Sequence, residues 1–336
     1  MLGRIFYKKR VKLTSLPTPL EYMENLSRRY RVHIYVKRDD VMELALGGNK
    51  VRKLEFIFAD ILSKKADTVI TKGAFHSNHV RLTAAAAAKL GLETYLVLYP
   101  PIRPDIRGNL LLDALLGAKI VKAPSRGEAD RVMEEIALEL KKKGRKPYII
   151  PGGGASPIGV YGYALAFLEI IEQMRSISRL PDYIIHASGT GATQAGLVLG
   201  RKLLAVQDTE VIGISVGPSS SDLRKRVSEL ATESARTLGL DVDVTPEEVV
   251  VRDEYIFGGY ASITKQVVDT MKYIGRTEGL ILDPVYTAKA FYGLLDLIEK
   301  GEIREESVVV FIHTGGIPIT MQYPEELLRH LEVERN

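Results

Sequence analysis

The stretch YIIHASGTGATQAGLVLG, residues 183–200, decides the fold class. It begins with an apolar, β-branched run at 183–186, passes through a loop of small residues, and continues as an apolar helical pattern. A strand followed at once by a helix is the repeating unit of parallel α/β sheets. Because the loop opens a helix, its backbone N–H groups and the helix dipole favour a bound anion. The stretch therefore predicts an α/β fold with a phosphate site at this loop.

The loop does not fit a nucleotide. It lacks the Lys-Ser/Thr pair of a P-loop, and the position of the third glycine in a dinucleotide motif is Gln194. The next strand ends at Gly217 without an acidic residue to hold a ribose. A single phosphate is therefore the better interpretation, and a tight turn without a ligand is the alternative. The candidate phosphate ligands are Gly189, Thr190, Gly191, Ala192 and Thr193.

Short β-rich runs alternate with helical patterns along the whole chain. Three glycines, Gly91, Gly117 and Gly144, stand where helices are expected to end. The alternation predicts mostly parallel sheets with helices on both faces, in two doubly wound domains. The predicted strands are 32–37, 68–71, 94–98, 119–121, 148–150, 183–186, 211–216 and 308–312.

Residue types suited to chemistry gather directly after these strands. The carboxyl ends of parallel strands are where open α/β sheets bind ligands. We therefore expect the segments that follow the strands to line one shared cleft. These segments are 39–50, 72–79, 151–154, 187–196, 283–287 and 313–316.

Lys50 follows two glycines in GGNKVRKLE, residues 47–55. A buried lysine loses its proton more easily and then becomes a nucleophile for an aldehyde. The alternative is an ordinary loop followed by an exposed basic helix face. In the segment HSNH, residues 76–79, Ser77 and Asn78 could hold a carboxylate and a ring hydroxyl. Ser77 could equally cap a helix, and His79 fits a structural role better than a catalytic one.

Composition excludes several classes of protein. The 336 residues include no cysteine, which excludes disulfides, thiolate metal sites and a cysteine nucleophile, and no metal site is predicted. The net charge of +4 is mild, and the basic run 141–146 fits a helix end better than a nucleic-acid surface. No apolar run is long enough to span a membrane, and the N-terminus does not read as a signal peptide. We expect a cytoplasmic protein that binds neither nucleic acid nor membrane.

Five motifs together resemble one enzyme family, the 1-aminocyclopropane-1-carboxylate (ACC) deaminase/D-cysteine desulfhydrase family. They are GGNKVRKLE at 47–55, HSNH at 76–79, SGTGATQAG at 188–196, LDPVYTAKAFYGL at 282–294 and HTGG at 313–316. The match begins at LPTPL, residues 16–20, and continues in order to the end of the chain. Each motif is weak alone, and the combination is specific.

The resemblance implies a pyridoxal 5′-phosphate (PLP) enzyme of the tryptophan synthase β fold type. It implies that Lys50 forms a Schiff base with the cofactor. Asn49 and Lys53, which lie on either side of Lys50 in the sequence, are further candidates for binding the cofactor. Asn78 matches the residue that bonds the 3′-oxygen of the cofactor, and Ser77 the serine beside the substrate, with His79 next to them. The remaining positions that the resemblance assigns are the phosphate loop Gly189–Thr193, the active-site tyrosines Tyr260 and Tyr286, and Thr287 and Thr314 near the pyridine nitrogen.

The resemblance also implies the domains. A large domain would comprise residues 1–52 and 162–336, a small domain residues 53–161, with the active site in the cleft between them. A homodimer is expected.

The resemblance further implies the reaction, α,β-elimination of D-cysteine, or a related β-substituted amino acid, to pyruvate, ammonia and sulfide. Thr287 and Thr314 replace the Glu and Leu of ACC deaminases, and both changes favour this branch. ACC deamination and elimination of serine or cysteate are the alternatives. A non-catalytic binding protein or a nucleotide-dependent oxidoreductase is the alternative from another class. A dehydrogenase needs a ribose-binding acid, which is absent, whereas a PLP enzyme needs Lys50 and a single phosphate loop, which are both present.

Overall fold

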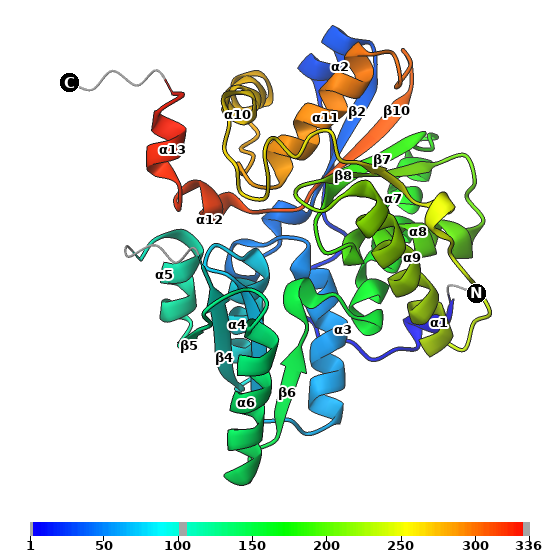
Figure 1. Ribbon diagram of the computed structural model, residues 1–336. Helices are drawn as coiled ribbons and strands as arrows, with labels where there is room; N and C mark the ends of the chain where they lie inside the picture. The colour runs from blue at the N-terminus through cyan, green and yellow to red at the C-terminus, as the bar shows by residue number, and fades with distance from the viewer. Residues whose placement is uncertain (1–2, 101–105, 332–336) are drawn as a thin grey trace.

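The computed structural model describes residues 3–100 and 106–331, and Figure 1 shows two sheets with helices around each. The first sheet has six strands in the order β1-β2-β10-β7-β8-β9. All neighbours in it are parallel except β1 and β2. Its strands are β1 (Leu20–Tyr22), β2 (His33–Arg38), β7 (Tyr183–Ser188), β8 (Glu210–Ser215), β9 (Val250–Arg252) and β10 (Val308–His313).

Helices cover both faces of this sheet because successive side chains of each strand point to opposite faces. Ile184 packs with the helices of one face and Ile185 with those of the other. The first face carries α7 (Pro157–Ser176), α8 (Ala192–Leu204) and α9 (Ser220–Thr237). The second carries α2 (Glu24–Tyr30), α10 (Lys265–Glu278) and α11 (Thr287–Glu299).

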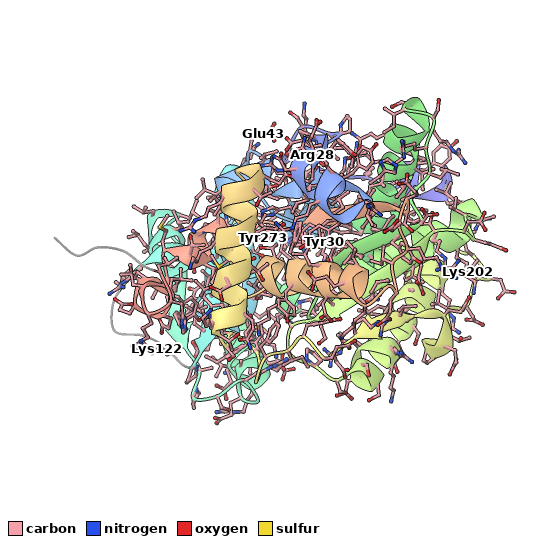
Figure 2. The ribbon with its side chains drawn as sticks, turned by 90° about the horizontal axis from the view of Figure 1, so that it is seen from above. Arg28, Tyr30, Glu43, Lys122, Lys202 and Tyr273 are labelled. Atoms are coloured by element: carbon pink, nitrogen blue, oxygen red, sulfur yellow. The ribbon has the colours of Figure 1, made fainter. Side chains whose placement is uncertain are left out.

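Aromatic side chains join two helices of the second face. Figure 2 shows Tyr30 of α2 and Tyr273 of α10 close together. The guanidinium carbon of Arg29 lies 6.0 Å from the ring centre of Tyr30 and 5.3 Å from that of Tyr273. The contact fixes α10 beside the sheet, and α10 follows directly on the loop that carries Tyr260.

The second sheet has four parallel strands in the order β5-β4-β3-β6. Ile70 and Val97 face α6, whereas Val69 and Leu96 face the opposite side. Its strands are β3 (Thr68–Ala74), β4 (Glu93–Tyr99), β5 (Lys119–Lys122) and β6 (Pro147–Ile150). Its helices are α6 (Ala129–Lys142) on one face and α3 (Lys50–Ser63), α4 (Asn78–Lys89) and α5 (Gly108–Leu115) on the other.

The predicted α/β class with mostly parallel sheets is confirmed, and each of the eight predicted strands is a strand of the structure. Sequence analysis missed β1 and β9, which have three residues each, too few to show a periodic pattern. Gly91, Gly117 and Gly144 follow the ends of α4, α5 and α6 with φ of +71°, +74° and +76°. They end these helices in the left-handed conformation that glycine adopts without strain.

Short elements complete the chain. They are α1 (Gly3–Phe6), α12 (Ile317–Thr320), α13 (Pro324–Leu328) and the 3₁₀ turns Asp39–Val41, Leu44–Leu46, Gly152–Gly154 and Pro246–Glu248. The four-stranded sheet lies within residues 68–150, inside the segment 53–161 that was expected to form the small domain. The domain limits themselves stay a prediction. Among the described residues, none of the helices is long and apolar enough to cross a membrane.

Candidate active site

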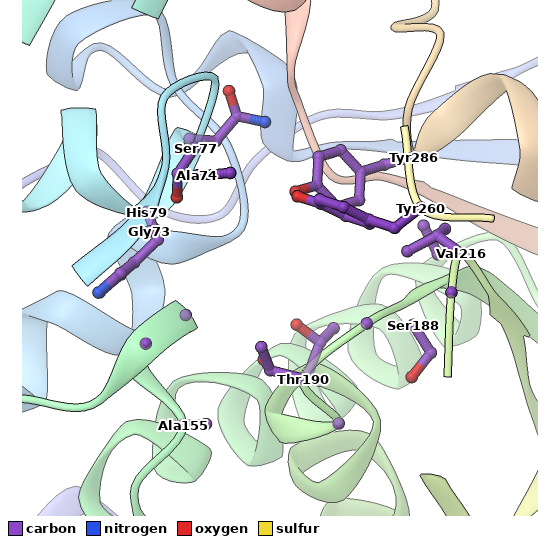
Figure 3. A pocket seen from close by; sticks show the side chains of 18 of the residues that line it. Gly73, Ala74, Ser77, His79, Ala155, Ser188, Thr190, Val216, Tyr260 and Tyr286 are labelled. Carbon is purple, nitrogen blue, oxygen red and sulfur yellow. The ribbon is translucent and has the colours of Figure 1, made fainter. Parts of the chain in front are cut away.

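A cavity of about 510 Å³ receives residues from all six of the segments that follow the strands. Figure 3 shows Tyr260 and Tyr286 on one side of it, Ser77 and His79 on the other, and Thr190 on a third. Residues that the sequence had singled out for a cofactor or substrate and that line the cavity are Asn49, Lys50, Ser77, Asn78, His79, Gly189, Thr190, Gly191, Thr193, Tyr260, Tyr286 and Thr314. Lys53, Ala192 and Thr287 do not line it.

Lys50 stands at the first position of α3, held there by two glycines. Gly47 has a φ of +62°, and a Cβ at this position would collide with the carbonyl oxygen of Asp40. Gly48 has a φ of +121°, and its Cβ would lie 3.0 Å from the carbonyl oxygen of Thr314. The backbone N–H of Asn49 donates to that same carbonyl at 3.0 Å. These contacts fix Lys50 beside the C-terminal end of β10, where it lines the cavity.

Burial gives Lys50 the properties of a nucleophile. It lowers the pKa of the Lys50 ammonium from 10.5 to about 8, so a larger neutral fraction is present near neutral pH. Lys53, one turn further along α3, is 1 % exposed, and burial and the charge of Lys50 hold its pKa well below the usual value. Its Nζ has no hydrogen-bond partner among the described residues. Burial and mutual repulsion disfavour the protonated forms of both amines, and an anionic ligand would restore them, so the pair favours such a ligand.

The phosphate loop connects β7 to α8. Gly191 has a φ of +85°, and a Cβ there would meet Val227 at 3.1 Å, so a side chain is doubly unfavourable. The first N–H groups of α8 have no partner within the helix. The side-chain amide of Asn49 donates to Thr193 Oγ1 at 3.0 Å, which ties the loop to the lysine segment. Ala192 is fully buried and can contribute only its backbone.

Ser77 and Asn78 form the start of α4 opposite the tyrosines. Ser77 caps this helix, because its Oγ accepts from the N–H of Val80 at 3.3 Å, and it lines the cavity as well. Both interpretations of Ser77 are therefore compatible with its position. The Asn78 carbonyl oxygen accepts from Asn109 Nδ2 at 2.9 Å, so its own amide N–H₂ remains to donate into the cavity.

His79 forms part of the cavity wall and does not act as a proton carrier. Its Nε2 lies 2.8 Å from Thr71 Oγ1, and its Nδ1 lies 3.5 Å from Thr83 Oγ1. Burial and the charges of Lys50 and Lys53 hold the pKa of His79 well below its usual value. A neutral imidazole with both nitrogens engaged is a structural histidine, as the sequence had favoured.

Tyr260 and Tyr286 are hydrogen-bonded to each other through their hydroxyl groups. Their ring centres are 6.0 Å apart with the planes at 66°. Burial, and then the neighbouring Tyr260, raise the pKa of Tyr286 well above its usual value. Tyr286 is therefore protonated at neutral pH and can act as a proton donor toward the cavity.

The two threonines expected near the pyridine nitrogen differ in position. Thr314 lines the cavity and is 6 % exposed. Thr287 lies behind the wall, where its hydroxyl donates to Asp283 Oδ2 at 2.7 Å and accepts from the Asp283 N–H at 2.7 Å. Thr287 therefore does not line the cavity, and its position near the pyridine nitrogen stays a prediction. The alternative that it caps the helix 288–299 is wrong, because it is the first residue of α11 and Tyr286 precedes it as the cap.

Asp283 is the residue whose role sequence analysis missed. Its carboxylate accepts from the N–H groups of Val285, Tyr286 and Thr287 at 2.8 to 2.9 Å. It therefore holds the turn that presents Tyr286 to the cavity. Further lining residues that the sequence did not single out are Lys72, Tyr99, Arg126 and Arg226. Their positions follow from chain segments that come together only in the fold.

The residues present fit a phosphate-bearing aldehyde cofactor. The cavity is lined by a lysine of lowered pKa and by a glycine-rich helix start. Lys53 Nζ is buried without a hydrogen-bond partner behind the lysine, and an anionic cofactor would favour its protonated form. Among the described residues, no three His, Cys, Asp or Glu side chains are arranged to bind a metal ion.

Comparison with known proteins agrees with this arrangement. Residues 11–315 match the family described as "Pyridoxal-phosphate dependent enzyme". A protein of Pyrococcus abyssi, named "Putative 1-aminocyclopropane-1-carboxylate deaminase", is 45 % identical over 324 residues, which are 96 % of either chain. A protein of the same name from Pyrococcus horikoshii is 46 % identical over 321 residues, 95 % of either chain.

Solved structures give the same result. The structure described as "ACC deaminase homologue" matches with a TM-score of 0.89 at 45 % identity, over 98 % of both chains. The Escherichia coli diaminopropionate ammonia lyase matches with a TM-score of 0.68 at 20 % identity, over 98 % of this chain and 90 % of the other. At 20 % identity the second likeness shows the fold alone.

Proposed function

Because the chain belongs to the family of pyridoxal-phosphate-dependent enzymes, we propose that it is a lyase that releases ammonia from a small amino acid by breaking a bond at the β-carbon. The cofactor is pyridoxal 5′-phosphate. The observation that carries the proposal is the single cavity in which Lys50, Ser77 and the hydrogen-bonded pair Tyr260 and Tyr286 surround the space beside a phosphate loop.

We propose that Lys50 holds the cofactor through its amine and that Gly189–Thr193 hold the phosphate. Asn78 donates its amide N–H₂ to the ring oxygen, and Asn49 and Lys53 support the lysine and the loop. When bound, the cofactor acts as an electron sink for negative charge at the α-carbon of the substrate.

Protons then move between two groups of this chain. The neutral Lys50 Nζ would take the proton from the α-carbon of the substrate. Ser77 Oγ orients the substrate carboxylate at the start of α4. On the opposite side, the Tyr286 hydroxyl donates a proton to the atom that leaves the β-carbon, and its hydrogen bond with Tyr260 fixes its direction. A base and an acid that line the same cavity suit an elimination.

The preferred substrate is a β-substituted amino acid such as D-cysteine, which yields pyruvate, ammonia and sulfide. The support is the neutral wall at Thr314. The carboxylate of Asp283, which lies behind the cavity wall, is fully buried and occupied by three backbone N–H groups and the Thr287 hydroxyl. A wall without free negative charge stabilises a protonated ring nitrogen poorly, and a good β-leaving group tolerates this.

ACC is the second candidate substrate, and the names of the relatives support it better than D-cysteine. Two proteins at 45 % and 46 % identity are named putative ACC deaminases. ACC deamination adds water and releases ammonia and 2-oxobutanoate, and it needs an acid aimed at a ring carbon. Tyr286 is placed to serve in that role too. Serine and cysteate are further β-substituted substrates that the cavity admits chemically.

The deciding experiment compares kcat/KM for D-cysteine, L-cysteine, D-serine, cysteate and ACC on the purified holoenzyme, with pyruvate and 2-oxobutanoate measured separately. We expect D-cysteine to exceed ACC by at least about tenfold, which corresponds to 1.4 kcal/mol in the barrier. ACC turnover equal to that of D-cysteine would reject this preference. Racemisation or transamination without either keto acid would reject elimination altogether.

The homodimer and the cytoplasmic location rest on the resemblance and on the sequence alone, and they remain proposals. Light scattering at micromolar concentration tests the first, and a monomer would contradict it.

A further inference from the structure

A second cavity of about 410 Å³ adjoins the substrate cavity. The two share the residues Ala74, Tyr99, Arg126 and Tyr260 in their walls. His76 and Tyr323 line only the second cavity, and they are 2 % and 5 % exposed. The partition between the cavities therefore contains titratable side chains for which the elimination described above has no use.

Hydrogen bonds connect the two cavities through this partition. Tyr323 OH lies 2.9 Å from His76 Nδ1, and His76 Nε2 lies 3.2 Å from Tyr260 OH. Tyr260 OH is bonded in turn to Tyr286 OH, the proposed proton donor. The ring centres of His76 and Tyr260 are 5.4 Å apart, and those of His76 and Tyr323 are 5.6 Å apart. Four side chains from segments far apart in the sequence thus form one continuous line of hydrogen bonds, from Tyr323 through His76 and Tyr260 to Tyr286.

The line has a consistent direction for protons. A neutral imidazole has one N–H and one acceptor nitrogen. If Tyr323 donates to Nδ1, then the Nε2–H donates to Tyr260, Tyr260 donates to Tyr286, and the Tyr286 proton points into the substrate cavity. Every donor in this arrangement has an acceptor, so a proton can pass from the second cavity to the first by one shift along each bond.

The elimination creates a need for such a path. When Tyr286 gives its proton to the leaving atom, its hydroxyl becomes a phenolate. Burial raises the pKa of Tyr286, so this phenolate costs free energy. A substrate that fills the first cavity displaces the water there. The replacement proton then has to arrive from another side.

We propose that His76 is a positioning residue that reprotonates Tyr286 through Tyr260 and is itself supplied from the second cavity through Tyr323. The β-bond breaks with its electron pair on the leaving atom, which takes the Tyr286 proton. Tyr260 passes its proton to Tyr286, His76 Nε2 passes one to Tyr260, Nδ1 takes one from Tyr323, and solvent in the second cavity restores Tyr323. The net change is one proton moved from solvent to the leaving group, with no oxidation or reduction. The inference rests on the proposed elimination.

Two substrates separate proton delivery from general damage to the site. Sulfide leaves D-cysteine more readily when it is protonated, whereas chloride leaves β-chloro-D-alanine without a proton. In the His76→Gln holoenzyme we expect kcat for D-cysteine to fall by about 10- to 100-fold, toward the lower end of general acid–base effects. Turnover of β-chloro-D-alanine should change by less than about threefold.

Matched variants sharpen the result. Tyr323→Phe keeps the ring and removes the hydroxyl, so it should reproduce the selective loss. Ile263→Val alters the same second cavity without a titratable group, and it should leave both substrates unaffected. Imidazole should restore D-cysteine turnover to His76→Ala, because the second cavity can admit it. Equal losses for both substrates, or full activity in Tyr323→Phe, would overturn the relay.

A measurement without turnover tests the direction. ¹⁵N NMR of the imidazole groups, with His76 assigned from the spectrum of His76→Gln, should show the neutral Nε2–H form with Nδ1 accepting. The Nδ1 signal should shift in Tyr323→Phe. A neutral Nδ1–H form would overturn the relay alone. If the wild type makes pyruvate from neither substrate, the proposed elimination fails, and the relay fails with it.

Discussion

Arg52 and Lys53 are consecutive residues of helix α3, and both bury a basic side chain. The guanidinium of Arg52 donates to Asp39 at 2.8 and 2.9 Å and to Glu169 at 2.9 and 3.0 Å. Lys37 Nζ adds a contact of 2.6 Å to Glu169. Lys53 Nζ has no hydrogen-bond partner among the described residues, and burial and the charge of Lys50 beside it hold its pKa well below the usual value.

The difference separates a structural polar group from one prepared for a ligand. A buried charge costs free energy unless partners satisfy it. The Arg52 cluster is satisfied within the protein and joins β2, α3 and α7. Lys50 and Lys53 lack negatively charged partners. Lys50 lines the cavity that also contains the phosphate loop, and Lys53 lies behind it. We infer that an anionic cofactor completes the second group, and the following predictions test this.

The largest expected effect is that of Lys50→Ala. It should reduce turnover by roughly 10⁴-fold or more, because it removes both the attachment of the cofactor and the base for the α-proton. Borohydride reduction and peptide mass spectrometry should find the cofactor on Lys50 in the wild type, with Lys53→Ala as the control that keeps the adduct. A reducible adduct that persists on another lysine in Lys50→Ala would contradict the assignment.

Next in size is Arg52→Met, expected to lower the free energy of unfolding by about 3–5 kcal/mol, because Asp39 and Glu169 remain buried without their partner. Urea denaturation of the cofactor-free protein, followed by circular dichroism, measures it. The control is Arg131→Met in α6, which breaks ion pairs with exposed partners and should cost no more than about 1 kcal/mol. Equal losses would mean that the cluster is not structural.

Gly191→Val should weaken PLP binding by about 10- to 100-fold, since forcing a β-branched residue into a positive φ costs on the order of 1–3 kcal/mol and Val227 is already close. Fluorescence titration of the cofactor-free protein gives the affinity. Gly91→Val is the matched control, with a φ of +71° and no atom within 4 Å of its Cβ. Unchanged affinity in Gly191→Val would exclude this loop as the phosphate site.

Lys53→Met should act in the opposite sense to Arg52→Met. Replacing a buried amine that has no hydrogen-bond partner should raise the free energy of unfolding of the cofactor-free protein by about 1–3 kcal/mol. The same variant should bind PLP more weakly, because positive charge is lost near the site. Parallel denaturation and titration measure both effects, and a destabilised Lys53→Met would show that Lys53 is structural after all.

Two further predictions concern the pH dependence of stability. Burial would raise the pKa of Glu169, but the hydrogen bond and charge of Arg52 and then Lys37 lower it from 4.5 to about 2. The stabilisation by Glu169 is therefore complete above pH 4.5 and is lost as the pH falls toward 2. The free energy of unfolding, measured against pH for the wild type and Glu169→Gln, tests this. If both proteins lost the same stability as the pH fell, the prediction would be contradicted.

For Lys50 the sign is reversed. Its pKa is lowered from 10.5 to about 8, so the unfolded chain keeps the proton that the folded protein loses. The cofactor-free protein should gain at most roughly 3 kcal/mol between pH 8 and 10.5, at 1.36 kcal/mol per pKa unit. Lys50→Ala should lack this gain and keep the acid loss. If the gain at high pH persisted in Lys50→Ala, the titrating group would be another residue.

Much of the site could be read from sequence because its residues follow strands in short motifs. Lys50, Ser77, Asn78 and the phosphate loop are fixed by local patterns of glycine, small residues and strand ends, and the fold brings them to one cavity. Thr287 shows the limit of that approach. Its neighbour in the motif, Tyr286, faces the cavity, yet the Thr287 hydroxyl turns inward to Asp283, because one residue further along a helix start points about 100° away.

The sequence by itself determined the parallel α/β class, eight of the ten strands, and the lysine and loop that a phosphate-bearing aldehyde requires. These depend on hydrophobic period and on backbone conformations that few residues allow, which are local properties. Only the tertiary structure decided that Arg52 is satisfied while Lys53 is not, and that His76 connects Tyr260 to Tyr323. Such contacts join residues up to 247 positions apart, and no local pattern encodes which distant polar groups meet when the chain folds.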